Sequence, residues 1–357
     1  MFEYNRVNAR TWSLLGPSGA HGIAAMELAE INKKVLMLTA DLCFFSGLER
    51  FKIAYPDRLY DVGIAEQNMI GVAAGLAKEG FIPFANTYAS FCSSRCADQV
   101  RVNMSYMKLP IKLVGLTAGL GAGILGATHI SVEDVAFMRA LPNITVISPA
   151  DCTEIVKSML AVAETSEPTY IRLTGPMNTP IVYKENYDFE IGKAIALKEG
   201  GDVCFIASGS MVAESLKAAE ILEKEGIFAS VVNMHTIKPL DSECIERMAC
   251  KHGLLITVEE HSVYGGLGSA VAEVLTRKGI NTRLSIIGIE DFFPSSGDYR
   301  YQLKQCGLTA EQISAKVKNL LLGGGYFRDI VRSINPKYIV AVDIPFLAKN
   351  EGIENVA

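Results

Sequence analysis

The sequence predicts an α/β protein with two doubly wound α/β domains and a short C-terminal extension. From residue 20 to residue 320, apolar runs rich in β-branched residues alternate with segments whose apolar residues recur at helical spacing. This alternation is typical of parallel sheets covered by helices. A polar stretch over 174–188 holds Gly175, Pro176 and Pro180, and turn formers at this density divide the series into two domains.

The first domain is expected to build a parallel sheet. Its strand candidates, each a short apolar run, are Val35–Ala40, Phe81–Asn86, Ile111–Leu116, Ile144–Ser148 and Tyr170–Leu173. Its helix candidates, each with apolar residues at every third or fourth position, are Gly22–Ile31, Met69–Lys78, Asp98–Met107 and Cys152–Ala163. A helix between two successive strands lets those strands run parallel.

The second domain repeats the alternation. Its strand candidates are Val203–Ser208, Ala229–Asn233, Leu254–Val258 and Leu284–Ile289, and its helix candidates are Val212–Glu225, Ser242–Lys251, Gly268–Arg277 and Ala310–Leu321. Gly323, Gly324 and Gly325 then interrupt the helical pattern. The extension beyond them is rich in apolar residues, which would form a sticky patch in water. We therefore predict that the extension packs on its own domain or at a subunit interface.

Composition excludes several classes of protein. Hydrophobic residues at 49% and charged residues at 20% describe an ordinary soluble globular protein, and a net charge of -5 argues against a nucleic-acid-binding surface. No apolar run approaches the roughly 20 residues that span a membrane. The 8 cysteines are scattered without a CxxC pair. We therefore expect no metal ligands and no disulfide framework in this chain, and reduced thiols favour a cytoplasmic protein.

The segment Asp61–Asn68, DVGIAEQN, places one carboxylate at a strand-to-helix turn. A glutamate near a helix N-terminus is favoured by the helix dipole and usually has no other role. Glu66, however, has Ile64, Met69 and Ile70 around it. A carboxyl group among apolar neighbours tends to hold its proton, because desolvation penalises the charged form. Such an acid can share a proton with a ring nitrogen.

Two later segments carry side chains suited to a binding site. Tyr88 and Phe91 lie in YASF, although aromatic residues at a strand end commonly fill a core. Glycines over 119–126 precede His129, and glycines at this density let a ligand approach the backbone closely. A histidine after such a loop more often caps a turn, but it can also exchange protons with a hydroxyl or carbonyl group near neutral pH.

Two further features allow two interpretations each. Arg172 ends the last strand of the first domain, where parallel sheets bind ligands, and a guanidinium suits a phosphate or carboxylate. It is equally an ordinary surface arginine at a domain junction. Gly265, Gly266 and Gly268 precede a helix and could cradle an anion, although tight packing of a strand on a helix is the commoner reason for such glycines.

Residues 12–322 resemble the C-terminal subunit of split, two-chain transketolases. The resemblance rests on DVGIAEQN, YASF, ATHISVEDVAFMRALPNITVISPAD from residue 127, TYIRLTG, and VEEHSVYGGLGSAVAE from residue 258. It implies a thiamine pyrimidine-binding domain over 12–175, a linker over 176–191, a C-terminal domain of transketolase type over 192–322, and an extension over 323–357.

The resemblance implies a thiamine-diphosphate- and Mg²⁺-dependent transferase that moves a two-carbon ketol unit between sugars. Glu66 would hydrogen-bond the pyrimidine and favour its imino tautomer. Phe91 and Tyr88 would stack on that ring, and His129 would face the thiazolium and shuttle protons for the substrate. No GDG segment followed by Asn occurs in the chain. The ligands of Mg²⁺ and diphosphate are therefore expected from a diphosphate-binding partner subunit, in an assembly with two copies of each chain.

Departures from the family pattern concern the substrate. Positions that hold Thr-Arg, Ser, His and Asp in typical transketolases hold Ser18-Gly19, Phe45, Thr117 and Leu125 here. Arg172 is what remains of the usual phosphate-binding residues, and His21 and Asp41 are further candidate substrate contacts. We therefore predict a modified, deoxy or nucleotide-linked sugar in place of the usual xylulose phosphate and ribose phosphate pair.

Two alternatives stay open at this point. A decarboxylating relative, such as a deoxyxylulose phosphate synthase or the β subunit of a 2-oxo acid dehydrogenase, shares both domains and would prefer pyruvate to hydroxypyruvate. A non-catalytic subunit that has kept the fold would show no turnover with any partner. The presence of both Glu66 and His129 favours a catalytic subunit.

Overall fold

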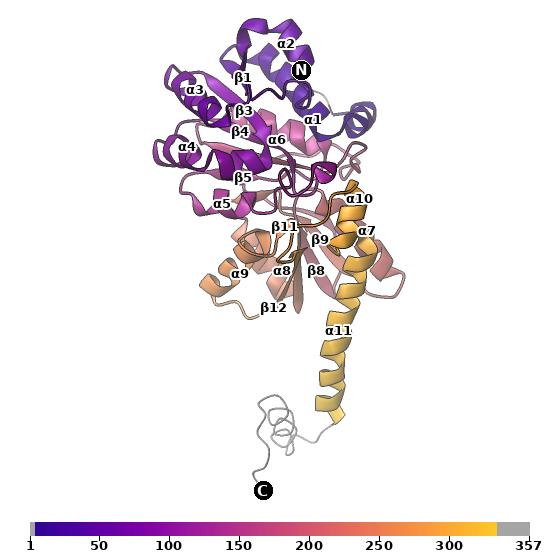
Figure 1. The fold of residues 1–357 in the computed structure, drawn as a ribbon. Coiled ribbons are helices and arrows are strands. Elements are labelled where there is room, and N and C mark those ends of the chain that lie inside the picture. Colours follow the sequence, from indigo (N-terminus) through magenta and orange to yellow (C-terminus); the bar gives the residue numbers. More distant parts are fainter. Residues whose placement is uncertain (1–3, 334–357) are drawn as a thin grey trace.

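The computed structural model describes residues 4–333, with side chains through Leu322. These residues form two α/β halves, each built around a mainly parallel sheet with helices on its faces (Figure 1). The predicted fold class is confirmed. Residues 334–357, on which most of the prediction for the extension rests, lie outside the described residues.

The first sheet has seven strands in the order β10-β5-β6-β4-β3-β1-β2. The strands of the first half are parallel, and they are β1 (Val35–Thr39), β2 (Leu59–Asp61), β3 (Ile82–Tyr88), β4 (Lys112–Ala118), β5 (Thr145–Ile147) and β6 (Thr169–Thr174). Strand β10 (Thr236–Lys238) belongs to the second half of the chain and pairs antiparallel with β5. The two halves therefore share this sheet.

Helices cover both faces of the first sheet. One face carries α1 (Arg6–Ile31) and α6 (Cys152–Ala163), and the other carries α3 (Glu66–Lys78), η2 (Phe91–Arg95), α4 (Ala97–Gln99), η3 (Val100–Tyr106) and α5 (Asp134–Ala140). Side chains of a strand point to alternate faces of the sheet, so successive residues of β1 pack in different cores. Met37 packs on the face of α1 and α6, and Leu38 packs on the face of α3 and α5. The short elements α2 (Glu49–Ala54), η1 (Pro56–Arg58) and η4 (Gly123–Leu125) lie in the connections.

Helix α1 begins sixteen residues before the predicted start at Gly22. The side chain of Asn5 caps it by accepting the N–H of Asn8. The helix kinks at Gly16, whose φ of 73° is a left-handed conformation that favours glycine. A Cβ at this position would lie 2.9 Å from the Cα of Met177. Glycine is therefore required both by the backbone conformation and by the close contact.

The second sheet has five strands in the order β12-β11-β8-β9-β7. They are β7 (Ile195–Lys198), which is antiparallel to β9, and the parallel strands β8 (Val203–Ala207), β9 (Ala229–Asn233), β11 (Leu254–Ser262) and β12 (Arg283–Ile289). Its helices are α7 (Met211–Glu223), α8 (Ser242–Lys251), α9 (Leu267–Lys278), α10 (Tyr299–Gln305) and α11 (Ala310–Ser333). Two apolar cores lie on its two faces.

The expectation that three glycines end the last helix is wrong. Helix α11 continues through Gly323, Gly324 and Gly325 to Ser333. Figure 1 shows it projecting from the second half, away from the first. Glycine weakens a helix by about 1 kcal/mol per residue without preventing helical backbone angles, so glycines alone do not fix a helix end.

Two general features bear on the class of protein. Within residues 4–333, the helices are all too short or too polar to cross a lipid bilayer. The 8 cysteines are free thiols, and most of them are buried. Small buried thiols of this kind fill core space as hydrophobic side chains do.

Candidate active site

Glu66 is the first residue of α3 and is 4% exposed. The loop before it is held by Asp61, whose Oδ1 accepts the N–H groups of Gly63 at 3.1 Å and Asp41 at 3.0 Å. Met69, one turn further along the helix, is fully buried and fixes α3 on the sheet. A carboxylate in the first helical turn is also stabilised by the helix dipole. The sequence thus holds this acid at one defined point of the sheet edge.

The surroundings of Glu66 differ from the apolar ones that the sequence predicts. Arg95 Nη1 lies 2.6 Å from Glu66 Oε1 in an ion pair, and the guanidinium carbon lies 3.7 Å from the ring centroid of Phe91. Gln67 Nε2 donates to the carbonyl of Arg95 at 3.0 Å. Ile64 is 76% exposed. A basic side chain therefore bridges the acid and the aromatic ring, because Phe91 and Arg95 occupy successive turns of the same helical segment.

Three rings lie together beside this pair. The centroid of the His129 imidazole is 5.3 Å from Tyr88 and 5.3 Å from Phe91, and the two aromatic rings are 5.8 Å apart. They come from the end of β3, from η2 and from the loop after β4, which meet at the carboxyl edge of the sheet. Burial raises the pKa of Tyr88, so its phenol is neutral at physiological pH. Thr128 Oγ1 is 2.9 Å from His129 Nδ1.

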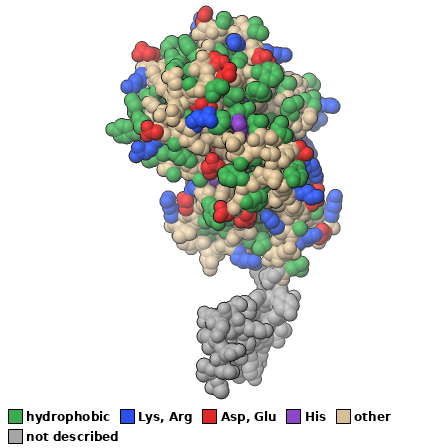
Figure 2. Space-filling model, viewed as in Figure 1, with side chains coloured by type: hydrophobic (Ala, Val, Ile, Leu, Met, Phe, Trp, Pro, Cys, Tyr) green, Lys and Arg blue, Asp and Glu red, His purple; other side chains and the backbone are tan. Residues whose placement is uncertain are grey.

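A pocket of about 410 Å³ opens beside Glu66. Its walls are Ile64, Ala65, Glu66, Gln67, Asn68 and Arg95. Figure 2 shows acidic and basic side chains interspersed over the visible face, with a histidine at the surface near the middle of the upper half. A carboxylate, an aromatic ring and an imidazole beside an open pocket can bind a flat heterocycle and transfer a proton. The structure thus brings together Glu66, Phe91, Tyr88 and His129.

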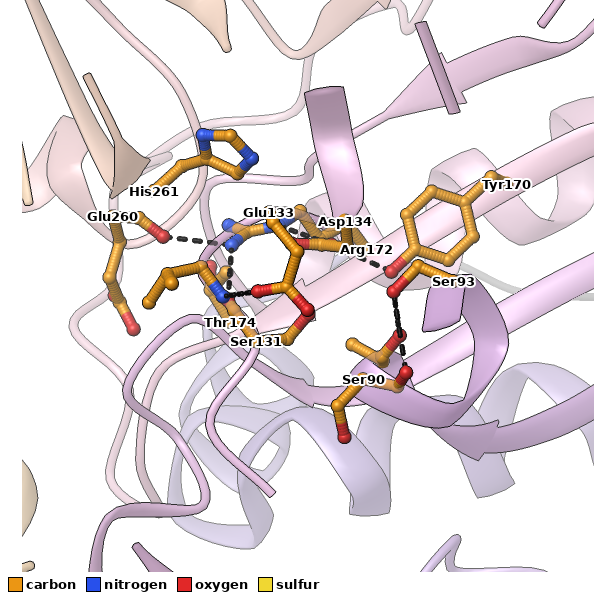
Figure 3. Close-up of polar contacts among 12 residues, drawn as sticks. Ser90, Ser93, Ser131, Glu133, Asp134, Tyr170, Arg172, Thr174, Glu260 and His261 are labelled. Carbon is orange, nitrogen blue, oxygen red and sulfur yellow. Dashed lines mark hydrogen bonds and ion pairs between the residues drawn. The ribbon is translucent and has the colours of Figure 1, made fainter. Parts of the chain in front are cut away.

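Arg172, a predicted substrate contact, is buried and paired within the chain. Arg172 is 2% exposed, its Nε donates to Asp134 Oδ2 at 2.8 Å, and its Nη2 donates to the carbonyl of Glu260 at 2.8 Å. Tyr170 also donates to Asp134 Oδ2, at 2.7 Å. Figure 3 shows the guanidinium enclosed between Asp134 and Glu260. Arg172 therefore joins the two halves of the chain.

The ion pair between Arg172 and Asp134 also determines the pKa of the Asp134 carboxyl group. Burial alone would raise the pKa of Asp134, but the charge and hydrogen bonds of Arg172 outweigh burial and hold that pKa below its ordinary value. Burial likewise works against the charge of Arg172, and Asp134 compensates for it. A buried guanidinium matched to a buried carboxylate has no charge left for a phosphate.

The two other candidate substrate contacts differ from each other. His21 is fully buried, and its Nδ1 is 2.7 Å from the carbonyl of Ser46. Burial lowers the pKa of His21 to about 4, so the ring is uncharged at neutral pH. His21 contacts backbone and does not line the pocket beside Glu66, so its substrate contact stays a prediction. Asp41 is exposed just after β1, at the same sheet edge as Tyr88, and stays a predicted contact.

Two positions that depart from the family pattern, Phe45 and Leu125, present exposed apolar side chains. Phe44 and Phe45 are 67% and 59% exposed and form an edge-to-face pair with centroids 5.3 Å apart. Leu125 is also exposed, in the loop that leads to His129. Exposed aromatic pairs of this kind are found where a protein meets a ligand or another chain.

The glycines before α9 allow tight packing of the helix N-terminus on strand β11, which is the commoner of the two interpretations above. Both carboxylate oxygens of Glu259 accept N–H groups at this helix N-terminus, from Leu267 at 2.6 Å and from Gly268 at 2.8 Å. A Cβ on Gly266 would lie 1.9 Å from Glu259 Oε2. Because the chain supplies its own anion here, the N-terminus of α9 has no room for a ligand.

Comparisons with known proteins agree with this architecture. Residues 18–177 match the transketolase pyrimidine-binding domain and residues 192–313 match the transketolase C-terminal domain. The 6-deoxy-6-sulfo-D-fructose transketolase subunit SqwH of Clostridium sp. (strain MSTE9) is 43% identical over 81% of this chain and 89% of its own length. An apulose-4-phosphate transketolase subunit of Phocaeicola vulgatus is 36% identical over 81% of this chain and 92% of its own.

One solved structure and one longer relative also match this chain. A split-gene transketolase described as an inactive β4 tetramer is 41% identical, with a TM-score of 0.77, over 85% of this chain and 97% of its own. The 1-deoxy-D-xylulose-5-phosphate synthase of Desulforudis audaxviator is 38% identical over 82% of this chain, but the match spans only 46% of that protein.

Fold and matches together define a pyrimidine-binding α/β unit followed by a transketolase C-terminal unit. The chain belongs to the transketolase family and resembles throughout the C-terminal subunits of its split members. The family consists of thiamine-diphosphate-dependent transferases, and the transketolase interpretation fits these relatives better than a deoxyxylulose phosphate synthase.

Proposed function

We propose that this chain contributes the pyrimidine-binding half of a transketolase active site and that a separate subunit contributes the half that binds diphosphate and Mg²⁺. The observation that carries the proposal is the contact between Glu66, Arg95 and Phe91. A flat group with N–H donors already lies on Phe91 and donates to Glu66. This arrangement supports the proposal, because a planar hydrogen-bonding ring would fit between the same aromatic face and carboxylate.

Each side chain then has a defined task. Thiamine diphosphate, when bound, supplies the carbon nucleophile that accepts and passes on the two-carbon unit. Glu66 holds a proton against the pyrimidine nitrogen, and Phe91, with Tyr88 behind it, orients the ring. His129 exchanges protons with substrate hydroxyl and carbonyl groups, which its half-exposed ring can reach.

The assembly proposed is two copies of this chain with two copies of the partner. Support comes from the similar chain that forms a β4 tetramer without activity, which shows that this type of subunit associates with itself. The exposed Phe44, Phe45 and Ile124 give this chain apolar surface close to the sheet edge that carries the site. Such surface suits a partner that completes the site.

We further propose a modified sugar as substrate. The usual phosphate-binding residues are largely replaced: Gly19 and Thr117 stand where typical transketolases have an arginine and a histidine, and Arg172 is paired with Asp134. Each charge-assisted contact to phosphate is worth roughly 1.5–3 kcal/mol. Two similar chains are named for a sulfonated deoxy sugar and for apulose 4-phosphate, which supports a substrate outside the standard pair.

The substrate proposal predicts the outcome of a panel assay. The reconstituted complex should use the standard pair of xylulose phosphate and ribose phosphate at least about a hundredfold less efficiently than its best modified sugar, because two or three phosphate contacts are lost. Parallel assays with pyruvate and hydroxypyruvate as donors control for a decarboxylating activity. Ordinary efficiency with the standard pair would overturn the substrate proposal and leave the cofactor chemistry intact.

The contacts of Arg95 lead to a second prediction, which concerns the affinity for the cofactor. Its guanidinium uses the ring face and the carboxylate oxygen that we assign to the pyrimidine, so it must move when the cofactor binds. A partly buried ion pair and a cation–π contact are together worth on the order of 1–2 kcal/mol. Arg95→Ala should therefore bind thiamine diphosphate about 5- to 30-fold more tightly in the reconstituted complex, as measured by calorimetry.

Arg101→Ala is the matched control for Arg95→Ala, because Arg101 is an exposed arginine in the next helical segment. It should leave the affinity unchanged. Weaker binding by Arg95→Ala would show instead that the guanidinium stays in place and holds the bound cofactor.

A further inference from the structure

The loop over 119–126 is fixed by the second half of the chain as well as by the sheet that carries it. Strand β4 ends at Ala118, and the next residues leave the sheet. Leu120 N–H donates to Glu260 Oε1 at 2.6 Å. The carbonyl of Gly123 accepts from Gln302 Nε2 at 3.1 Å and from the N–H of Gly297 at 3.3 Å. Three groups of the second half therefore hold the backbone of this loop.

Glu260 is itself held rigidly. It is 1% exposed on β11, and its Oε2 accepts the hydroxyl groups of Ser210 and Tyr299. Its carbonyl accepts Arg172 Nη2 at 2.8 Å. A buried carboxylate with its oxygens engaged by three donors has one arrangement available, because any other would leave a buried polar group unpaired.

The loop glycines make room for these contacts. Gly119 has a φ of 63°, and a Cβ on it would lie 2.4 Å from Glu260 Oε1. A Cβ on Gly123 would lie 2.5 Å from the carbonyl oxygen of Gly297, and one on Gly126 would lie 2.5 Å from Ser296 Oγ. At these three glycines the close neighbour is the second half of the chain.

The fixed loop leads directly to His129. The carbonyl of Gly126 accepts the N–H groups of His129 and Ile130, both at 3.0 Å. Gly119 and Ser131 exchange two backbone hydrogen bonds, of 2.9 and 3.2 Å. His129 therefore lies between two anchored points, and a shift of the loop would move its ring relative to Tyr88 and Phe91.

We propose that Glu260, assisted by Gln302, is a positioning residue that sets the place of His129 for proton transfer. The proposal rests on the function proposed above. It gives the second half of the chain a part in catalysis, although none of its side chains is assigned to cofactor or substrate. Glu260 acts through the Leu120 N–H, and Gln302 acts through the Gly123 carbonyl.

The test uses the complex reconstituted with the partner subunit. Glu260→Ala removes the acceptor for Leu120, and Gln302→Leu removes the donor to Gly123 and serves if the first variant does not fold. Each should lower kcat at least about tenfold, with the affinity for thiamine diphosphate changed less than about threefold. Glu260→Gln keeps an oxygen for Leu120 and should restore kcat to within about threefold of the wild type.

A matched control and a double-mutant cycle separate positioning from general stability. Glu259→Ala removes the neighbouring buried carboxylate, which does not contact the loop, and should lower Tm while kcat is kept. In a His129→Ala background, Glu260→Ala should cause less than about a twofold further loss, because the ring that it positions is gone. An equal loss in both backgrounds would overturn the proposal.

Amide hydrogen exchange supplies a readout that does not depend on activity. In the chain alone, Glu260→Ala should speed exchange over residues 119–131 at least about tenfold relative to Glu259→Ala. Unchanged exchange there would overturn the positioning role even in an active enzyme. If the wild-type complex shows no ketol transfer, the proposed function fails, and faster exchange would still identify Glu260 as the loop anchor.

Discussion

The purified chain, without a partner subunit, is expected to transfer no two-carbon unit between sugars at saturating thiamine diphosphate and Mg²⁺. The chain carries no GDG segment followed by Asn, and Arg95, the one cationic side chain among the described residues that line the pocket beside Glu66, is paired with Glu66. Addition of the diphosphate-binding subunit should raise the rate from background to that of a working transketolase. Coupled assays of the aldehyde product measure both states.

The control for this experiment is the partner subunit alone, which should also be inactive. A similar chain was found as an inactive β4 tetramer, so loss of activity in the chain alone is to be checked against its oligomeric state by light scattering. Mg²⁺-dependent turnover by this chain without any partner would contradict the division of the site between two subunits.

Glu66→Gln in the reconstituted complex is expected to lower turnover at least about a hundredfold. Glutamine keeps the shape of the side chain but cannot hold a proton against a ring nitrogen. It also removes the ion pair with Arg95, whose guanidinium is 44% exposed and can turn to water. The fold should survive, because Met69 and Ile70 anchor α3 independently of Glu66.

Glu79→Gln is the matched control, since Glu79 is an exposed carboxylate at the other end of α3. It should keep full activity. Comparable rates for Glu66→Gln and Glu79→Gln would mean that Glu66 is an ordinary first-turn glutamate and that the proposed role is incorrect.

The fold was predictable where burial makes the local pattern strong. All residues of β1, β6, β8 and β9 are buried, and such strands appear in the sequence as mainly apolar runs whose ends are predicted within one or two residues. Strand β2 at the sheet edge has three residues, and β10 reaches the first sheet from the second half of the chain. Short edge strands carry little local signal, and long-range pairing carries none.

The grouping of the site side chains at one edge of the sheet was predictable from the sequence. Glu66, Tyr88, Phe91 and His129 follow strands of one parallel sheet, and the carboxyl ends of such strands meet at one edge, as the aromatic and ion-pair contacts show. The spacing of Phe91 and Arg95 at i, i+4 would have indicated that the guanidinium can lie on the ring.

The burial of Arg172 and of His21 was not predictable from the neighbouring sequence, for one physical reason. Each is a polar side chain near a strand end or in a loop-rich segment, which the sequence alone presents as available to a ligand. Arg172 is buried by Asp134, thirty-eight residues away, and by Glu260, eighty-eight residues away. His21 is buried against the backbone of Ser46. Partners that are this distant along the chain leave no pattern in the neighbouring residues.

The measurement that tests the central claim most directly is calorimetric titration of thiamine diphosphate, with Mg²⁺ present, into this chain alone and into its equimolar mixture with the diphosphate-binding subunit. Glu66, Phe91 and Tyr88 supply contacts to one end of the cofactor, so the chain alone should bind it weakly and the mixture should bind it at least about a hundredfold more tightly. Tight, Mg²⁺-dependent binding by the chain alone, or equally weak binding by the mixture, would contradict the claim that this chain provides one half of the site.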